Sequence, residues 1–257
     1  MTRAYTGRGD LPDAPLPESV STGHDAFLLD VDGTLLDIAD TPEGVVVPDA
    51  LKRSLSRLQE QTAGATALVS GRRIADLDDL FAPLRLAAIG CHGAEWRRTP
   101  EVGIALRAPP LSARIGNALR AAVAELNGFR VEEKLYTLAF HYRQTPGIGP
   151  ELERRLRGAA QAFPELRFLH GKMVLEVKSG RFDKGESVGA LMEFEPFAGR
   201  RPVFLGDDIT DEDAFAEVHG LRGLGISVGR VIPEAVLMLA SPQAARQWLA
   251  EVVGNSD

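Results

Sequence analysis

Short apolar runs that alternate with helical segments are the feature that most restricts how this chain can fold. Three such runs occur in the first half, and each is followed by a loop that contains glycine. Segments with helical apolar spacing lie between them, and the same order returns in the last third of the chain. Alternation of this kind favours a parallel sheet with helices on its faces. The apolar runs are 26–29, 65–69, 86–89, 202–205 and 224–228.

The middle of the chain breaks this alternation. After a Pro-Pro pair at 109–110, the sequence predicts a helix and two strands, twice in succession. This αββαββ order indicates a small α+β insert with an antiparallel sheet at about 109–180, which we expect to form a separate cap. Segments 24–108 and 181–257 would then form a Rossmann-like α/β core with a parallel sheet and helices on both faces. Residues 1–23 are expected to form a flexible tail.

The composition limits the classes of partner. The chain has 257 residues and a net charge of −7, which argues against nucleic acid or an anionic membrane surface as a partner. No apolar run is long enough to span a bilayer, and the proline-rich start does not resemble a signal peptide. Cys91 is the only cysteine, which suits a reducing compartment. We expect a cytoplasmic monomer that acts on a small molecule.

Four loops carry residues that could take part in catalysis. Asp30 and Asp32 follow the first apolar run, and Gly33 then lets the backbone turn sharply. One carboxylate can act as a nucleophile and its neighbour as a general acid. The carboxyl ends of parallel strands share one edge of a sheet, where ligands bind. The other loops expected at this edge are Ser70-Gly71-Arg72, Lys184-Gly185 and Gly206-Asp207-Asp208.

Together these loops hold what phosphate chemistry needs. Asp30 and Asp207 supply the hard oxygen ligands that Mg²⁺ prefers. Ser70 and Lys184 can hold phosphate oxygens and neutralise developing charge. Any one loop taken alone also fits an acidic or polar turn without a catalytic role. The ordered set of four favours a phosphate-binding site.

The four loops resemble, in order, the four motifs of the haloacid dehalogenase superfamily of phosphohydrolases. More narrowly, the chain resembles the trehalose-6-phosphate phosphatases from about residue 26 to its end. The segments that carry the narrower resemblance are 70–72, 90–95 and 206–212, together with 132–134, 141–143 and 171–177 in the expected insert.

This resemblance implies Mg²⁺-dependent hydrolysis of trehalose 6-phosphate to trehalose and phosphate through an aspartyl-phosphate. Asp30 would attack phosphorus. Asp32 would protonate the leaving sugar oxygen and then activate the water that hydrolyses the intermediate. Lys184 and Ser70 would hold the transferring group.

The resemblance also implies a metal site and a substrate site. Mg²⁺ would contact Asp30, the backbone carbonyl of Asp32 and Asp207, while Asp208 and Asp211 would orient its waters and Lys184. The insert would select the sugar, although a solvated face of alternating charges explains its polar residues equally well from sequence alone. His92 fits a role in loop support as well as substrate contact. The expected substrate-binding residues are Gly33, Thr34, Gly71, Arg72 and His92 in the core, and Glu132, Lys134, His141, Arg143, Lys172 and Glu176 in the insert.

Three alternatives stay open at this point. The substrate could be another sugar phosphate, such as sucrose phosphate or a mannosyl-phosphoglycerate. A phosphohexomutase shares this kind of core and cap, and it would return the phosphoryl group to sugar rather than to water. A catalytically silent sugar-phosphate sensor needs no nucleophile, so the presence of both Asp30 and Asp32 argues against it.

Overall fold

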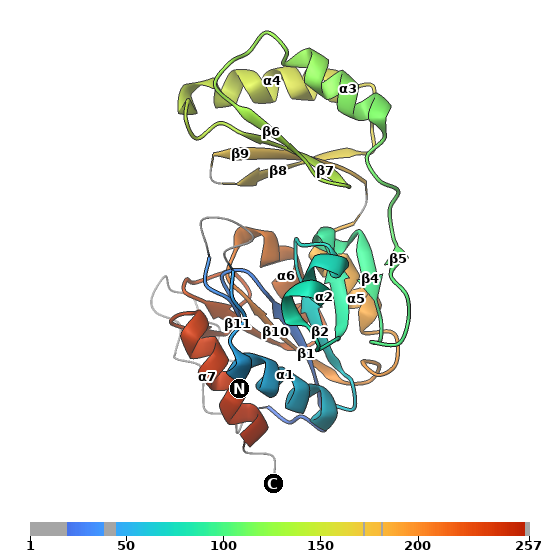
Figure 1. The fold of residues 1–257 in the computed structure, drawn as a ribbon, viewed down its shortest axis with the longest axis vertical. Coiled ribbons are helices and arrows are strands. Elements are labelled where there is room, and N and C mark those ends of the chain that lie inside the picture. The colour runs from blue at the N-terminus through green and yellow to red at the C-terminus, as the bar shows by residue number, and fades with distance from the viewer. Residues whose placement is uncertain (1–19, 39–44, 172, 181, 255–257) are drawn as a thin grey trace. The chain divides into compact units, whose positions relative to one another are not determined.

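The computed structural model divides into two compact units (Figure 1). The core unit contains the described residues up to Ala105 and those from Asp183 onward, and the insert unit is Leu106–Phe182. The predicted tail lies outside the described residues as far as position 19, and Lys172 lies outside them as well. In the part of the chain that is described, no helix has both the length and the hydrophobicity needed to cross a membrane. The described residues are 20–38, 45–171, 173–180 and 182–254.

An eight-stranded sheet runs through the core unit in the order β12-β11-β10-β1-β2-β3-β4-β5. The strands from β12 to β3 are parallel to their neighbours, and β4 is antiparallel to β3. The predicted α/β fold is confirmed, with β1 at the centre of the parallel part. The strands are β1 (Asp25–Asp30), β2 (Thr66–Val69), β3 (Ala87–Gly90), β4 (Glu95–Arg97), β5 (Ala105–Leu106), β10 (Arg201–Gly206), β11 (Leu224–Val228) and β12 (Leu237–Leu239).

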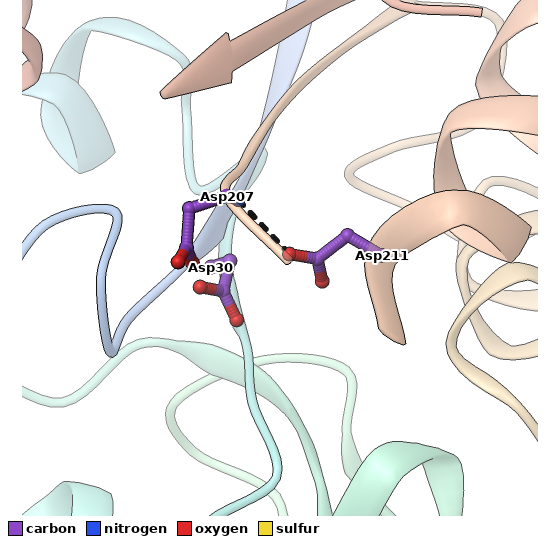
Figure 2. A group of neighbouring side chains, drawn as sticks. All are labelled: Asp30, Asp207 and Asp211. Carbon is purple, nitrogen blue, oxygen red and sulfur yellow. Dashed lines mark hydrogen bonds between the residues drawn. The ribbon is translucent and has the colours of Figure 1, made fainter. Parts of the chain in front are cut away.

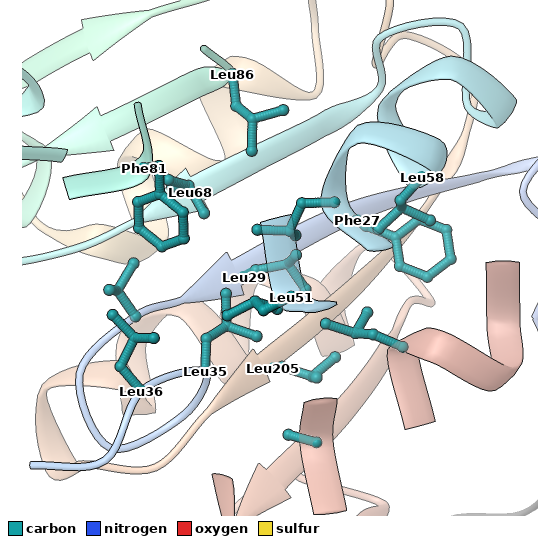
Figure 3. Packing of buried hydrophobic residues seen from close by; sticks show 14 of the residues in the cluster. Phe27, Leu29, Leu35, Leu36, Leu51, Leu58, Leu68, Phe81, Leu86 and Leu205 are labelled. Atoms are coloured by element: carbon teal, nitrogen blue, oxygen red, sulfur yellow. The ribbon is translucent and has the colours of Figure 1, made fainter. Parts of the chain in front are cut away.

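Helices cover both faces of this sheet, as the sequence predicts. Side chains alternate along β1, so Phe27 and Leu29 pack in the apolar cluster of α1, α2 and α7, part of which Figure 3 shows. Ala26 and Leu28 point to the opposite face and pack with α5 and α6. The helices are α1 (Asp49–Gln61), α2 (Ile74–Phe81), α5 (Lys184–Leu191), α6 (Glu212–Gly220) and α7 (Pro242–Gly254), and two short 3₁₀ helices are η3 (Cys91–Gly93) and η5 (Ile209–Asp211).

The insert unit has the predicted αββαββ order and an antiparallel sheet of four strands, β6-β7-β9-β8. One face of this sheet is apolar and packs with α3 and α4 through residues such as Leu138, Phe140 and Val177. The opposite face carries most of the polar residues of the strands. The elements are α3 (Ala113–Ala122), β6 (Arg130–Glu133), β7 (Thr137–His141), η4 (Pro146–Ile148), α4 (Gly149–Ala160), β8 (Leu166–Gly171) and β9 (Val174–Ser179).

Three short strands of the core, β4, β5 and β12, are not among the predicted strands. Strand β4 is the clearest case, because its residues Glu95 and Arg97 are charged yet buried. Arg97 makes two hydrogen bonds of 2.6 Å with Asp78, and its guanidinium also donates to the Leu86 carbonyl. These partners lie far away in the sequence, so a local pattern could not predict that the strand is buried.

Candidate active site

Asp30 occupies the carboxyl end of β1, with β10 and β2 on either side of that strand. Its side chain is almost completely buried. The Lys184 Nζ donates a hydrogen bond of 2.8 Å to Asp30 Oδ1 and one of 2.5 Å to Asp211 Oδ1. Lys184 is the first residue of α5, and Asp183 caps that helix by accepting the Glu186 N–H. The start of α5 thus places a buried ammonium beside the expected nucleophile.

A second loop brings two more carboxylates to Asp30. After β10, the 3₁₀ turn η5 folds Asp211 back, so that its Oδ2 accepts the backbone N–H of Asp207 and of Asp208, each at 3.1 Å. One oxygen each from Asp30, Asp207 and Asp211 lie within 4.8 Å of one another (Figure 2). The predicted loops after β1 and β10 therefore meet, and their carboxylates form a cluster that could hold a metal ion.

The charges in this cluster do not balance without a cation. Burial, and next the charge of Asp211, raise the pKa of Asp30 well above its ordinary value, although Lys184 acts in the opposite direction. Burial and Asp211 also raise the pKa of Asp207, to about 6. Burial alone would lower the pKa of Lys184, but Asp211 and Asp30 raise it above the ordinary value. Three crowded carboxylates against one ammonium fit a divalent cation with oxygen ligands.

Gly33 and Thr34 shape the loop that faces Asp207. Gly33 has a φ of +87°, and a Cβ added to it would lie 2.1 Å from Asp207 Oδ2. Only glycine fits both the left-handed backbone and this close approach. Thr34 is buried and donates a hydrogen bond of 3.1 Å to Asp207 Oδ1. Both residues therefore support Asp207 in this structure.

Arg72 forms a bidentate ion pair with Asp32. Its Nε lies 2.7 Å from Asp32 Oδ2, and its Nη2 lies 2.7 Å from Asp32 Oδ1. Ser70 follows β2, is buried, and accepts the Arg72 backbone N–H on its Oγ at 3.1 Å. The 70–72 loop and the loop after β1 are thus joined through the expected general acid.

Two further expected residues have neighbours within the core unit. The imidazole of His92 lies against Gly71, because a Cβ on Gly71 would be 2.5 Å from His92 Nε2. Asp208 is exposed, and its Oδ1 accepts the Ile209 N–H at 2.7 Å and lies 3.8 Å from Arg230. Its carboxylate is not among the three that form the carboxylate cluster.

An open cavity of about 440 Å³ adjoins the cluster. Gly33 and Asp207 form part of its wall, so it reaches the carboxylate cluster from the side of β10 and β11. The other lining residues are Asp37, Ile38, Val228, Gly229, Arg230 and Pro242.

The polar face of the insert sheet carries four of the expected sugar-binding residues. In one row across the strands, Glu132 pairs with Ala139 and Ala139 with Glu176. His141 Nε2 lies 2.9 Å from Glu132 Oε2, and Lys134 Nζ lies 2.9 Å from Glu176 Oε1. Burial would raise the pKa of Glu132, but the hydrogen bond from His141 and the charge of Lys134 lower it overall.

Arg143 is exposed and lies beyond the end of β7, outside the row of Glu132 and Glu176. Lys172 belongs to the positions that the structure does not describe. Glu95 makes a contact next to the 70–72 loop that the sequence did not predict. Its Oε2 accepts the backbone N–H of Ile74 at 2.9 Å, just after that loop.

The sequence of this chain is similar to those of known phosphatases. The family described as trehalose-phosphatase matches residues 28–235. A probable trehalose-phosphate phosphatase of Sinorhizobium fredii is 42% identical over 229 residues, which is 88% of this chain and 86% of that protein. The trehalose-6-phosphate phosphatase of Escherichia coli K12 is 38% identical over 225 residues, which is 87% of this chain and 85% of that protein.

Among solved structures, the C-terminal domain of C. albicans trehalose-6-phosphate phosphatase has the same fold. The TM-score is 0.76 at 20% identity, and the match covers 96% of this chain and 99% of that one. The family match spans both the carboxylate cluster and the insert unit. The chain therefore belongs to the trehalose-phosphatase family of the haloacid dehalogenase superfamily.

Proposed function

We propose that this chain hydrolyses trehalose 6-phosphate to trehalose and inorganic phosphate. The observation that carries the proposal is the buried contact between Asp30 and Lys184, placed beside Asp207 and Asp211 in a member of this family. A carboxylate held next to an ammonium at a strand end can approach a phosphate group without facing its full negative charge.

The reaction has two steps that use the same residues. In the first, an Asp30 oxygen attacks phosphorus, the bond from phosphorus to the sugar oxygen breaks, and Asp32 gives a proton to that oxygen. In the second, Asp32 takes a proton from water, which attacks phosphorus and releases phosphate from Asp30. Lys184 and Ser70 hold the phosphoryl oxygens through both steps.

Mg²⁺ fits the carboxylate cluster on the chemistry of its donors. Asp30 and Asp207 would hold it, with the backbone carbonyl of Asp32, while Asp208 and Asp211 would orient its waters. Bound there, the ion would neutralise charge on the carboxylates and on the phosphate. Asp211 also keeps Lys184 in place through its hydrogen bond.

The polar face of the insert sheet is the proposed sugar site. Sugar hydroxyls need both donors and acceptors, and the face offers Glu132, Lys134, His141 and Glu176 within two ion pairs. Arg143 and Lys172 are proposed to add donors. In the core unit, Gly33, Thr34, Gly71, Arg72 and His92 are proposed to surround the phosphate end of the substrate.

The test is phosphate release from a panel of sugar phosphates, with Mg²⁺ and with a chelator, and with Asp30→Asn as the blank. Selective release from trehalose 6-phosphate supports the proposal. Release from sucrose phosphate or a mannosyl-phosphoglycerate keeps the chemistry and changes the substrate. Transfer to a second sugar without phosphate release indicates a mutase. Tight binding without any turnover indicates a sensor.

The cytoplasmic location and the monomeric state stay predictions of the sequence. The single cysteine, Cys91, is buried and supports a reducing compartment. Size-exclusion chromatography of the full chain, read with light scattering, tests the monomer directly.

A further inference from the structure

The 90–95 segment follows β3 with a backbone that is rare for residues other than glycine. Cys91, His92 and Gly93 have φ values of +50°, +54° and +106° in succession. A side chain pays a steric penalty in this region, so surrounding contacts must hold the segment in place. Those contacts lead to two of the loops that carry the proposed chemistry.

The first contact is a ladder of backbone hydrogen bonds to the 70–72 loop. Ser70 donates its N–H to the Ile89 carbonyl at 2.9 Å. In return, Cys91 donates to the Arg72 carbonyl at 2.8 Å and His92 donates to the Ser70 carbonyl at 3.1 Å. The left-handed turn aims both N–H groups at the loop, so the backbone positions of Ser70 and Arg72 depend on this segment.

Glu95 holds the other end of the same loop. Helix α2 begins at Ile74, and Arg73 before it provides no side-chain cap. The buried Glu95 carboxylate accepts the Ile74 N–H at 2.9 Å instead. A carboxylate is well suited to a helix start, where N–H groups lack partners. Gly90 permits the approach, because an added Cβ would lie 3.0 Å from both the Arg72 carbonyl and the Ile74 nitrogen.

The segment also touches the start of α5. A Cβ on Gly93 would lie 2.4 Å from Ser187 Oγ and 2.5 Å from the Asp183 carbonyl. Ser187 Oγ donates to the Gly93 carbonyl at 3.4 Å. The helix that carries Lys184 and the loop that carries Arg72 therefore rest against one segment.

We propose that Glu95 is a positioning residue, which fixes the Arg72 backbone and, through the Arg72 guanidinium, the carboxylate of Asp32. The inference rests on the proposed function, in which Asp32 delivers the proton to the leaving oxygen. Ionised Asp32 accepts both 2.7 Å contacts from Arg72, and when Asp32 carries the proton its other oxygen still accepts from Arg72. The place of the Arg72 backbone therefore sets the direction in which the acid points. Loss of Glu95 frees the start of α2 and lets Arg72 draw Asp32 away from the leaving oxygen.

The experiment compares two substrates that differ in their need for this proton. Trehalose 6-phosphate has a poor leaving group, whereas p-nitrophenyl phosphate releases a phenolate that needs no proton. The ratio kcat/KM reports the steps up to departure of the leaving group. Because general acid catalysis contributes about 10²- to 10⁴-fold, we expect Glu95→Ala to lower kcat/KM for trehalose 6-phosphate at least about tenfold more than for p-nitrophenyl phosphate.

A milder variant and a matched control complete the design. Glu95→Gln keeps the shape and one acceptor oxygen, so we expect a smaller loss with the same substrate preference. Asp78→Asn is the control. Asp78 lies on α2 and pairs with the buried Arg97, which is on the same strand as Glu95, so this variant disturbs the strand without removing the Glu95 carboxylate. This control should lower the melting temperature. It should leave unchanged the ratio of kcat/KM for trehalose 6-phosphate to kcat/KM for p-nitrophenyl phosphate.

Equal loss for both substrates in the two Glu95 variants would overturn the inference and indicate a purely structural role. The same would follow if Asp78→Asn changed the ratio as much as Glu95→Ala. A native chain that hydrolyses p-nitrophenyl phosphate and trehalose 6-phosphate keeps the proposed function intact in either case. A native chain that hydrolyses neither ends the proposed function, and the inference falls with it.

Discussion

Thr34 donates a hydrogen bond of 3.1 Å to Asp207, which lies 173 positions later in the chain. The two residues follow β1 and β10, which are adjacent parallel strands. Because such strands end at the same edge, loops far apart in sequence can share one site. The hydroxyl orients one oxygen of Asp207, and the cluster with Asp30 and Asp211 forms beside it. The site therefore depends on the packing of loops as much as on its charged residues.

Gly33→Ala is expected to impair this arrangement severely. The new Cβ would lie 2.1 Å from Asp207 Oδ2, and alanine is strained at a φ of +87°. The backbone strain alone is worth about 1–2 kcal/mol. Gly199→Ala is the matched control, because Gly199 has a φ of +76° and no atom within 4 Å of the added Cβ. Melting temperature should fall in both variants, while kcat should fall only in Gly33→Ala. Normal turnover by Gly33→Ala would contradict the placement of Asp207.

Asp207→Asn is expected to stabilise the metal-free protein at pH 7. The pKa of Asp207 is raised to about 6 in the folded state from 3.8, so between about pH 4 and pH 6 the folded protein binds more protons than the unfolded chain. Its stability must therefore fall as the pH rises through this window. The variant lacks this titration. Partial exposure of Asp207 reduces the effect to about 1 kcal/mol, or about 2–4 °C in melting temperature.

Thermal melts of chelator-treated protein at pH 4.5 and pH 7 test this prediction. Native protein and variant should differ at pH 7, and the difference should become clearly smaller at pH 4.5. The opposing effect of Glu132, whose pKa is lowered, is present in both proteins and cancels in the comparison. With saturating Mg²⁺ the native protein should be the more stable of the two, because only the native chain keeps all three carboxylates. A variant that is less stable than the native protein at pH 7 without metal would show that ionised Asp207 does not destabilise the cluster.

The sequence predicts the fold well because buried parallel strands are continuous apolar runs. The run 26–29 lies within β1, and its two faces pack with different helices. Strand β4 escapes prediction for a physical reason. Its buried charges, Glu95 and Arg97, are satisfied by groups on other elements, and no local pattern reveals such partners.

In the candidate site, too, some features follow from local sequence patterns and others depend on contacts between distant residues. Two strand ends and a helix start predict that Asp30, Asp207 and Lys184 meet, and the structure brings them together. The contact of Arg72 with Asp32 joins residues 40 positions apart and depends on the shape of two loops. Sequence alone could assign Arg72 only to the general neighbourhood of an anionic substrate.

Asp30→Asn is expected to abolish phosphate release, with kcat at least about a thousandfold lower, because an amide oxygen is a poor nucleophile. The fold should survive, since Lys184 keeps its 2.5 Å hydrogen bond to Asp211. Removal of a buried carboxylate whose pKa is raised should also relieve repulsion in the cluster. Phosphate release, sugar-phosphate binding and a thermal melt measure these effects. Asp76→Asn, at an exposed position of α2, is the control and should behave like the native chain. A kcat that falls by much less than about a thousandfold would exclude Asp30 as the nucleophile.

Glu176→Ala is expected to separate sugar recognition from phosphate chemistry. Glu176 lies on the polar face of the insert sheet and pairs with Lys134 at 2.9 Å. Loss of a charged hydrogen bond to a sugar hydroxyl is worth about 1.5–3 kcal/mol, so kcat/KM for trehalose 6-phosphate should fall about 10- to 100-fold. Hydrolysis of p-nitrophenyl phosphate, which has no sugar, should change little. Glu133→Ala tests the opposite face of the same sheet, where Glu133 pairs with Arg120, and it should leave both substrates unaffected. Equal losses for both substrates in Glu176→Ala would instead assign Glu176 to the stability of the insert, because a residue that recognises sugar cannot slow a reaction in which no sugar takes part.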